Sequence, residues 1–322
     1  MNGYSQICDM SDMHMKRIDT YASIIERSIM WLLRSTYIRN RKSWKQMFAA
    51  LNNMGVQVTE NIKGGNLRSY FRKESSGVVQ TLSNKSELDM LSHARRVRIA
   101  CDSSSANTLV RQVHSDEYGF VCPFETPEGK EVGLVRYLAM TCLITDDIDG
   151  DAMRRLREVL AELHVSDKKV RAFSLILDGY YHCRIAEEGI AELRRLRASR
   201  REYRFCSVSV KNNYVFLYTE KGRMTRPLRR TIDDEFDFID QYEQGSDDVV
   251  IRFRKDPLAT HVEIHGSCQM GIAAAVAPFA NHSQASRIAF QAAMSKKSIG
   301  CDPFYLRNHV DGAADMWYGQ RD

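Results

Sequence analysis

Apolar residues recur at helical spacing in several stretches of the chain. Residues 20–54 repeat Ile, Leu and Trp every three or four positions, and residues 152–164 and 187–199 each place apolar side chains on one face. A shorter helix is expected over residues 86–98, opened by Ser83-Asn84 as cap residues. The pattern therefore predicts four helices, the first of them long.

Strand signals are concentrated in the middle of the chain. Residues 172–177 and 182–185 have the length and composition of short strands, and Asp178-Gly179 between them is typical of a tight hairpin turn. Residues 207–219 alternate between apolar and polar side chains, as strands do. Because helices and strands do not alternate regularly, the predicted fold class is α+β and not a doubly wound sheet.

Charge is separated along the sequence of 322 residues. The net charge of +5 fits a nucleic-acid partner without requiring one. Residues 34–45 interleave Arg and Lys with aromatic side chains, which suits either a grip on phosphate groups or a solvated helix face. Residues 191–230 hold twelve Lys and Arg against three Asp and Glu, whereas residues 231–250 hold eight acidic and no basic residues. The acidic block is interpreted as a solvated, mobile face.

Cysteine usage and hydropathy indicate the compartment. The eight cysteines include no C-x-x-C pair and no Cys/His cluster with zinc spacing, so we expect reduced thiols in an intracellular protein without a zinc site. No apolar run reaches membrane-spanning length, and residues 1–20 lack the apolar centre of a secretory signal. We accordingly expect no membrane partner.

The segment from residue 111 to residue 135 is dense in residues that restrict or bend the backbone. It contains R-Q-V-H, then Y-G-F-V-C-P-F-E-T-P-E-G, then G-L-V, with two prolines and three glycines. Proline fixes φ and glycine permits tight turns, so a rigid loop is predicted. Rigid loops that carry mixed charges often present functional groups.

This segment closely resembles a signature of the second-largest (β-type) subunit of multisubunit DNA-directed RNA polymerases. Residues 122–129, C-P-F-E-T-P-E-G, match the family run fully, and the family's R-Q-L-H element is similar to residues 111–114. The usual His-Trp-Gly before the cysteine is E-Y-G at residues 117–119, a departure at two positions. We call residues 111–135 the fork loop, after the region of the family that the segment resembles.

Four further stretches resemble the same family, in the family's order. L-S-H-A-R-R at residues 91–96 is similar to the fork segment, and residues 219–228 are similar to T-D-x-G-R-x-x-R-P-L. E-I-H at residues 263–265 and the run from P-F to Arg at residues 278–287 resemble the opening of the hybrid-binding region. Several ordered motifs are far more specific than one motif, and the resemblance covers about residues 60–322.

The resemblance implies a multi-lobed fragment of the subunit. It predicts a helical N-terminal segment as a remnant of the lobe and protrusion (1–60), a fork region (61–145), an external region (146–255) and the start of a hybrid-binding region (256–322). The family's subunit is usually much longer, so a partial or split form is expected. The departures from the family pattern favour a viral or otherwise divergent source.

The resemblance also implies an activity and partners. The expected activity is that of an RNA polymerase, a nucleotidyltransferase that works only as a multisubunit complex, with no catalytic residue in this chain alone. Its cofactor, Mg²⁺, is expected mainly on a partner largest subunit. Further expected partners are a chain with the missing C-terminal half, template DNA, RNA and nucleoside triphosphates. The expected location is the nucleus, the cytoplasm, or a viral factory or virion.

Candidate site residues follow from the motif positions. Arg287 matches the family's arginine near the incoming triphosphate, where a guanidinium offers a planar set of donors. Phe290 falls where the family often has a tyrosine beside that pocket. Glu128 and Arg111 match residues near the nucleotide or its supporting shell, and an ion pair that holds the fork is an equal alternative. Contact with the nucleic-acid backbone is expected from four basic residues: Lys296, Lys297, Arg95 and Arg96.

Three other functions compete with this interpretation. A non-catalytic polymerase-like paralogue would share the motifs. A basic nucleic-acid-binding protein would use residues 34–45 and 191–230. A stand-alone metal nuclease needs converging carboxylates, which only residues 146–151 offer. The same acidic stretch mimics part of a calcium loop, but Ala152 replaces the required glycine, so we expect the acidic start of a helix instead.

Overall fold

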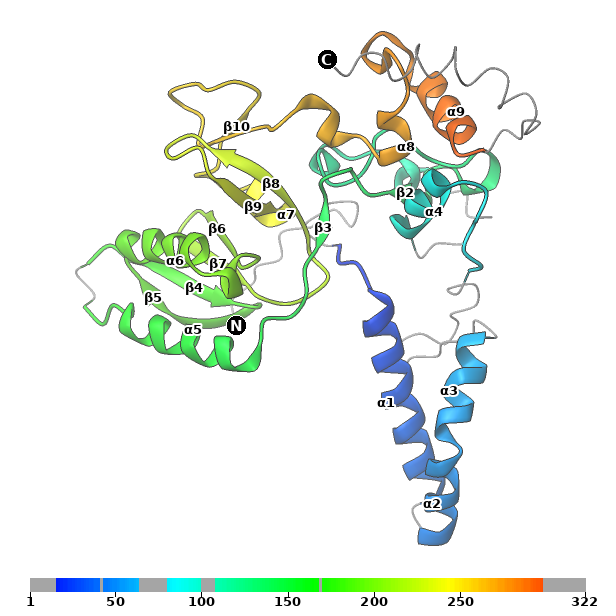
Figure 1. Ribbon diagram of the computed structural model, residues 1–322. Coiled ribbons are helices and arrows are strands. Elements are labelled where there is room, and N and C mark those ends of the chain that lie inside the picture. The colour runs from blue at the N-terminus through cyan, green and yellow to red at the C-terminus, as the bar shows by residue number, and fades with distance from the viewer. Residues whose placement is uncertain (1–15, 41–42, 64–79, 100–107, 168–169, 298–322) are drawn as a thin grey trace, which may run out of the picture.

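The computed structural model describes residues 16–40, 43–63, 80–99, 108–167 and 170–297 (Figure 1). These residues form separate groups of helices and antiparallel or mixed sheets, so the predicted α+β class is confirmed. None of the helices in these ranges has both the length and the apolar character needed to cross a bilayer.

Three helices form an arm that projects from the rest of the molecule (Figure 1). They are α1 (Tyr21–Asn40), α2 (Trp44–Asn52) and α3 (Met54–Lys63). The predicted long helix is therefore divided, and α3 was not predicted. Its sequence, M-G-V-Q-V-T-E-N-I-K, contains glycine and several β-branched residues, which lower helix propensity.

The largest core lies between two helices and a four-stranded sheet. The elements are α5 (Gly150–Glu162), β4 (Phe173–Leu177), β5 (Tyr180–Ile185), α6 (Glu187–Ser199), β6 (Ser207–Lys211) and β7 (Tyr214–Tyr218). The strand order is β5–β4–β7–β6. Leu156, Ile190 and Val215 are among the buried residues that α5, α6 and the sheet contribute. The predicted helices and strands of this part are confirmed, including the hairpin, where Asp178 and Gly179 adopt positive φ values of 47° and 88°.

A five-stranded sheet follows, which the sequence pattern did not predict. It consists of β3 (Leu143–Ile144), β8 (Met224–Arg230), β9 (Phe236–Asp240), β10 (Ile251–Arg252) and β11 (His261–Val262), with the short helix α7 (Gln241–Gln244) after β9. The central strand, β8, reads M-T-R-P-L-R-R, which lacks alternation and contains a proline. Pro227 is accommodated between the stretch that pairs with β3 and the stretch that pairs with β11.

The fork loop packs into a third group of elements. These are α4 (Glu87–Ala94), β1 (Arg96–Arg98), β2 (Val135–Tyr137), α8 (Ile272–Ala275) and α9 (Ala285–Ser295). The helix predicted over 86–98 ends early, because the chain turns at Arg95 and the next residues pair with β2. Its cap is Ser86, whose side chain accepts a hydrogen bond from the Asp89 backbone N–H at 3.1 Å, and not Ser83-Asn84.

The interpretation of residues 231–250 as a solvated face holds for residues 232–236, which are exposed, and is wrong for residues 237–243. Asp237 and Glu243 are buried and accept hydrogen bonds from the Arg197 guanidinium at 2.6 and 2.5 Å. Asp240 is buried against Arg223, with Nη1 and Oδ2 2.7 Å apart. The acidic block thus neutralises the basic block before it in the sequence. This pairing also weakens the hypothesis that residues 191–230 form a free basic surface for nucleic acid.

Candidate functional site

Arg226, from the motif R-P-L, joins three of the stretches that the sequence singled out. Its Nη1 donates to both carboxylate oxygens of Glu263, at 2.7 and 2.9 Å. Its guanidinium carbon lies 5.7 Å from the ring centroid of Tyr118 and 5.6 Å from that of Phe120. Gly119 has a φ of +80°, and a Cβ atom there would lie 2.5 Å from this carbon, so a larger residue would be strained and would displace the guanidinium. The fork loop, β8 and the E-I-H motif are therefore held at one point.

Arg136 organises the interior of the fork loop. This buried side chain pairs with the buried Glu117 carboxylate. It also donates from Nε to the Gly133 carbonyl at 2.9 Å and from Nη2 to the Gln112 carbonyl at 2.6 Å. Neither Arg136 nor Glu117 was predicted as a site residue. Their signal in the sequence was weak, because charged residues are usually exposed.

Arg111 supports the fork loop in this structure. Its Nη1 donates to the carbonyl oxygens of Lys130 at 2.9 Å and Val132 at 2.7 Å. Its own backbone passes directly under Gly133, which has a φ of +72°. These contacts are to carbonyl oxygens and not to a carboxylate, and the nucleotide contact of Arg111 stays a prediction. Glu128, by contrast, is exposed at the start of the short 3-10 helix η4 (Gly129–Glu131) and makes no capping hydrogen bond there.

Replacing Gly133 with alanine should destabilise the fork loop. The positive φ costs a non-glycine residue about 1–3 kcal/mol. In addition, the new Cβ would lie 2.4 Å from the Arg111 carbonyl oxygen. Gly129 has a φ of +81° but no atom within 4 Å of such a Cβ, so Gly129→Ala is a matched control for the backbone cost alone. Thermal unfolding should show a larger loss for Gly133→Ala, and equal losses would contradict the close approach.

Helix α9 presents two of the predicted nucleotide contacts on its exposed face. Ile288 and Ala292 are buried against the fork elements, whereas Arg287 and Phe290 are exposed. Residues three apart on a helix are neighbours, so these two side chains share one surface. Lys297, just beyond the helix, is also exposed.

Lys296 is not a free surface cation. Its side chain is 12% exposed, and Nζ lies 2.5 Å from Oε1 of the buried Glu125. Nζ also lies 4.0 Å from the ring centroid of Tyr137. Ser92 Oγ donates to the same Glu125 oxygen at 2.7 Å. Glu125 was not among the predicted site residues, although it lies within the best-matched motif.

Arg95 and Arg96 are half-buried, and both side chains interact with other groups of this chain. Arg95 Nη2 donates to the backbone carbonyls of Ala139 at 2.6 Å and Cys142 at 2.8 Å. Arg96 lies over the Tyr137 ring, 5.4 Å from its centroid, and its Nη1 donates to Gln80 Oε1 at 3.4 Å. The structure thus brings Lys296 and Arg96 together around Tyr137, on the side of α9 that faces the fork.

Two other candidate sites lack convergent groups. Asp149 caps α5 by accepting from the Asp151 backbone N–H at 3.2 Å, as expected for an acidic helix start. In the part of the chain that the structure describes, no three or more His, Cys, Asp and Glu side chains are grouped to hold a metal ion.

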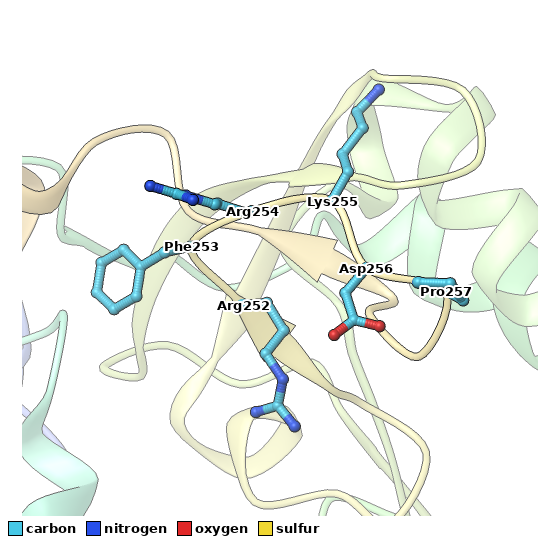
Figure 2. A pocket seen from close by; sticks show the side chains of 6 residues that line it. All are labelled: Arg252, Phe253, Arg254, Lys255, Asp256 and Pro257. Carbon is cyan, nitrogen blue, oxygen red and sulfur yellow. The ribbon is translucent and has the colours of Figure 1, made fainter.

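A hollow of about 480 Å³ lies at the loop between β10 and β11. Figure 2 shows that the side chains of this loop, which include Arg252, Phe253 and Lys255, spread in different directions.

Comparison with known proteins relates this part of the chain to one family model. Residues 80–144 match the family model for RNA polymerase Rpb2, domain 3. Over 294 residues the chain is 29% identical to DNA-directed RNA polymerase subunit Rpo2 of Sulfolobus acidocaldarius, covering 76% of this chain and 26% of that relative. The chain is related to part of the second-largest subunit of RNA polymerases. The resemblance seen in the sequence is thereby confirmed.

Other second-largest subunits are similar over the same span. DNA-directed RNA polymerase III subunit RPC2 of Saccharomyces cerevisiae is 26% identical, covering 81% of this chain and 26% of that relative. DNA-directed RNA polymerase II subunit 2 of Arabidopsis thaliana is 28% identical, covering 73% and 24%. The chain thus spans about a quarter of the length of the curated relatives it matches.

Proposed function

We propose that the chain serves as part of the second-largest subunit of a DNA-directed RNA polymerase. Its role is to contact the incoming nucleotide and the RNA–DNA hybrid from one side of the active centre. The observation that carries this proposal is the packing of α9 on the fork elements, because it combines two family-like motifs from distant parts of the sequence in one body. The relatives named above are all RNA polymerase subunits.

Arg287 and Phe290 are the proposed nucleotide contacts. Both are exposed on α9, so a nucleotide can approach them. A guanidinium binds phosphate oxygens through two parallel hydrogen bonds. A phenylalanine ring can stack on a base or sugar but, unlike tyrosine, supplies no hydroxyl donor. Glu128, exposed at the tip of the fork loop, is a third proposed contact, and Arg111 holds the loop that carries it.

Lys297 is the proposed contact with the hybrid backbone. It is exposed at the C-terminal end of α9, where a cation also suits the helix dipole. The other predicted backbone contacts, Lys296, Arg95 and Arg96, interact with a carboxylate, carbonyl groups and an aromatic ring. For these three residues we propose a supporting role in place of direct contact.

Mg²⁺, which nucleotidyl transfer requires in this family, is proposed to belong to a partner chain. The described residues of this chain do not fit a resident Mg²⁺ ion, because no cluster of ligating side chains occurs among them. When bound to the partner, the ions would neutralise charge on the reacting phosphates. This chain contributes the binding and positioning of the nucleotide, within the intracellular compartment in which transcription occurs.

The first test of this function compares the RNA synthesis of the purified chain with that of the complex isolated from cells. The purified chain alone should incorporate no nucleotides on a DNA template, because the Mg²⁺ ions are proposed to belong to a partner chain. Affinity purification of the tagged chain from its native cells should yield a largest subunit and template-dependent RNA synthesis. Mass spectrometry and an incorporation assay on the same eluate measure both outcomes.

An eluate from untagged cells is the control for this experiment. Recovery of the tagged chain alone, or only with DNA and without synthesis, would contradict the polymerase role. That result would favour the non-catalytic paralogue. RNA synthesis by this chain without a largest subunit would contradict the proposal that the Mg²⁺ ions belong to a partner chain.

A further inference from the structure

A buried carboxylate connects three segments that are distant in the sequence. Glu125, 4% exposed, lies in the fork loop and accepts from Ser92 on α4 and from Lys296 at the end of α9. Tyr137, on β2, covers the Lys296 ammonium. The fork loop, α4, β2 and α9 therefore meet around one ion pair.

A second polar contact reinforces the first. Ser86 Oγ donates to the backbone carbonyl of Lys296 at 2.7 Å. The same Ser86 caps α4 by accepting from the Asp89 N–H at 3.1 Å. The first residue before α4 is thus bonded to the residue that ends α9. Both polar contacts involve one end of α9.

The other contacts of α9 are of a different kind. Ile288 and Ala292 pack into an apolar cluster, and apolar contacts are not directional. Gln284, at the start of the helix, makes no side-chain capping hydrogen bond. The directional contacts at Lys296 add to this packing a restraint on the rotation of α9 about its axis.

We propose that Glu125 and Lys296 are positioning residues, which orient the exposed face of α9 relative to the fork loop. A buried ion pair is weak evidence for stability, since apolar residues of the same size often stabilise as well. It does restrict geometry, because charge-assisted hydrogen bonds need a defined distance and angle. A misplacement of about 1 Å in a catalytic centre can reduce the rate about a hundredfold. The catalytic consequence rests on the function proposed above.

The test uses the double variant E125Q/K296M in the assembled enzyme. It removes both charges, so no buried charge is left without a counterion, and it keeps an acceptor for Ser92. Hydrogen exchange of the amides in α9 should rise about tenfold or more, because the helix loses its directional contacts. Exchange in the sheet β5–β4–β7–β6 should stay unchanged. This readout does not depend on catalysis.

The second part of the test measures kcat and the KM for nucleoside triphosphates. E125Q/K296M should raise KM about tenfold, and adding Arg287→Ala should raise it little further, because residues that act through one another are not additive. A merely structural role would lower the yield of assembled enzyme and leave KM per enzyme unchanged.

The outcomes separate the two proposals. Faster exchange in α9, with KM unaffected by both E125Q/K296M and Arg287→Ala, would support the orientation of the helix and overturn the polymerase function. An increased KM for Arg287→Ala, with unchanged exchange and KM for E125Q/K296M, would overturn the positioning role and leave the function standing.

Discussion

Replacing Arg287 with alanine is expected to lower kcat/KM for nucleoside triphosphates by about ten- to a hundredfold in the assembled enzyme. A hydrogen bond to a charged group contributes about 1.5–3 kcal/mol, and the guanidinium offers more than one to a triphosphate. Assembly should be intact, because the Arg287 side chain is exposed and α9 is held by Ile288, Ala292 and Lys296. Steady-state kinetics with each nucleotide measures the effect.

Ser286 provides a matched control on the same helix. It is exposed in the first turn of α9, and one residue along a helix corresponds to a rotation of about 100°. Ser286→Ala should therefore leave kcat/KM within about twofold of the natural chain. Unchanged kinetics for Arg287→Ala at equal assembly would refute its nucleotide contact and favour a non-catalytic paralogue.

Local signals in the sequence predicted one part of the fold well. The helices near residues 152–164 and 187–199 and the Asp178-Gly179 hairpin depend on side-chain periodicity and turn chemistry within a few residues. The five-stranded sheet depends on pairing between distant strands. Its central strand, β8, carries Pro227 and several arginines, so a local pattern does not reveal it.

The charged blocks show the same limit of local sequence patterns, which do not reveal contacts between distant residues. Residues 231–250 were interpreted as a solvated face, because a block of like charges is usually one, and residues 191–230 were a candidate surface for nucleic acid. In the fold they pair with each other, as Arg223 does with Asp240. Pairing between distant residues offsets the cost of burying these charges, and it becomes visible only when the strands are in place.

The candidate site residues that lie within a family-like motif could be named from the sequence. The motif placed Arg287 and Phe290, and the structure puts both on one exposed face of α9. The division of the chain at residues 60, 145 and 255 stays a prediction. Sequence reasoning missed the Glu125–Lys296 pair, because its partners lie in different motifs and each alone suggests an ordinary charged residue.

Arg197→Met should destabilise the external part of the chain by about 3–5 kcal/mol, because it leaves two buried carboxylates without their counterion. Asp237 and Glu243 both lose the guanidinium that now lies 2.6 and 2.5 Å away. Arg195, on the same helix, pairs with Glu192 in an exposed position. Arg195→Met is therefore a matched control with an expected loss of less than about 1 kcal/mol. Urea unfolding followed by fluorescence measures both.

The same variant should also change the response to acid. Burial alone would raise the pKa of Asp237, but hydrogen bonding from His261 and the charge of Arg197 together hold that pKa well below its ordinary value of 3.8. A lowered pKa stabilises the fold above pH 3.8, and this contribution is lost as the pH falls below that value. Without Arg197 the pKa of Asp237 rises, so the free energy of unfolding should depend less on pH in this range. An equally steep acid dependence in Arg197→Met would show that the Arg197–Asp237 pair does not determine this titration.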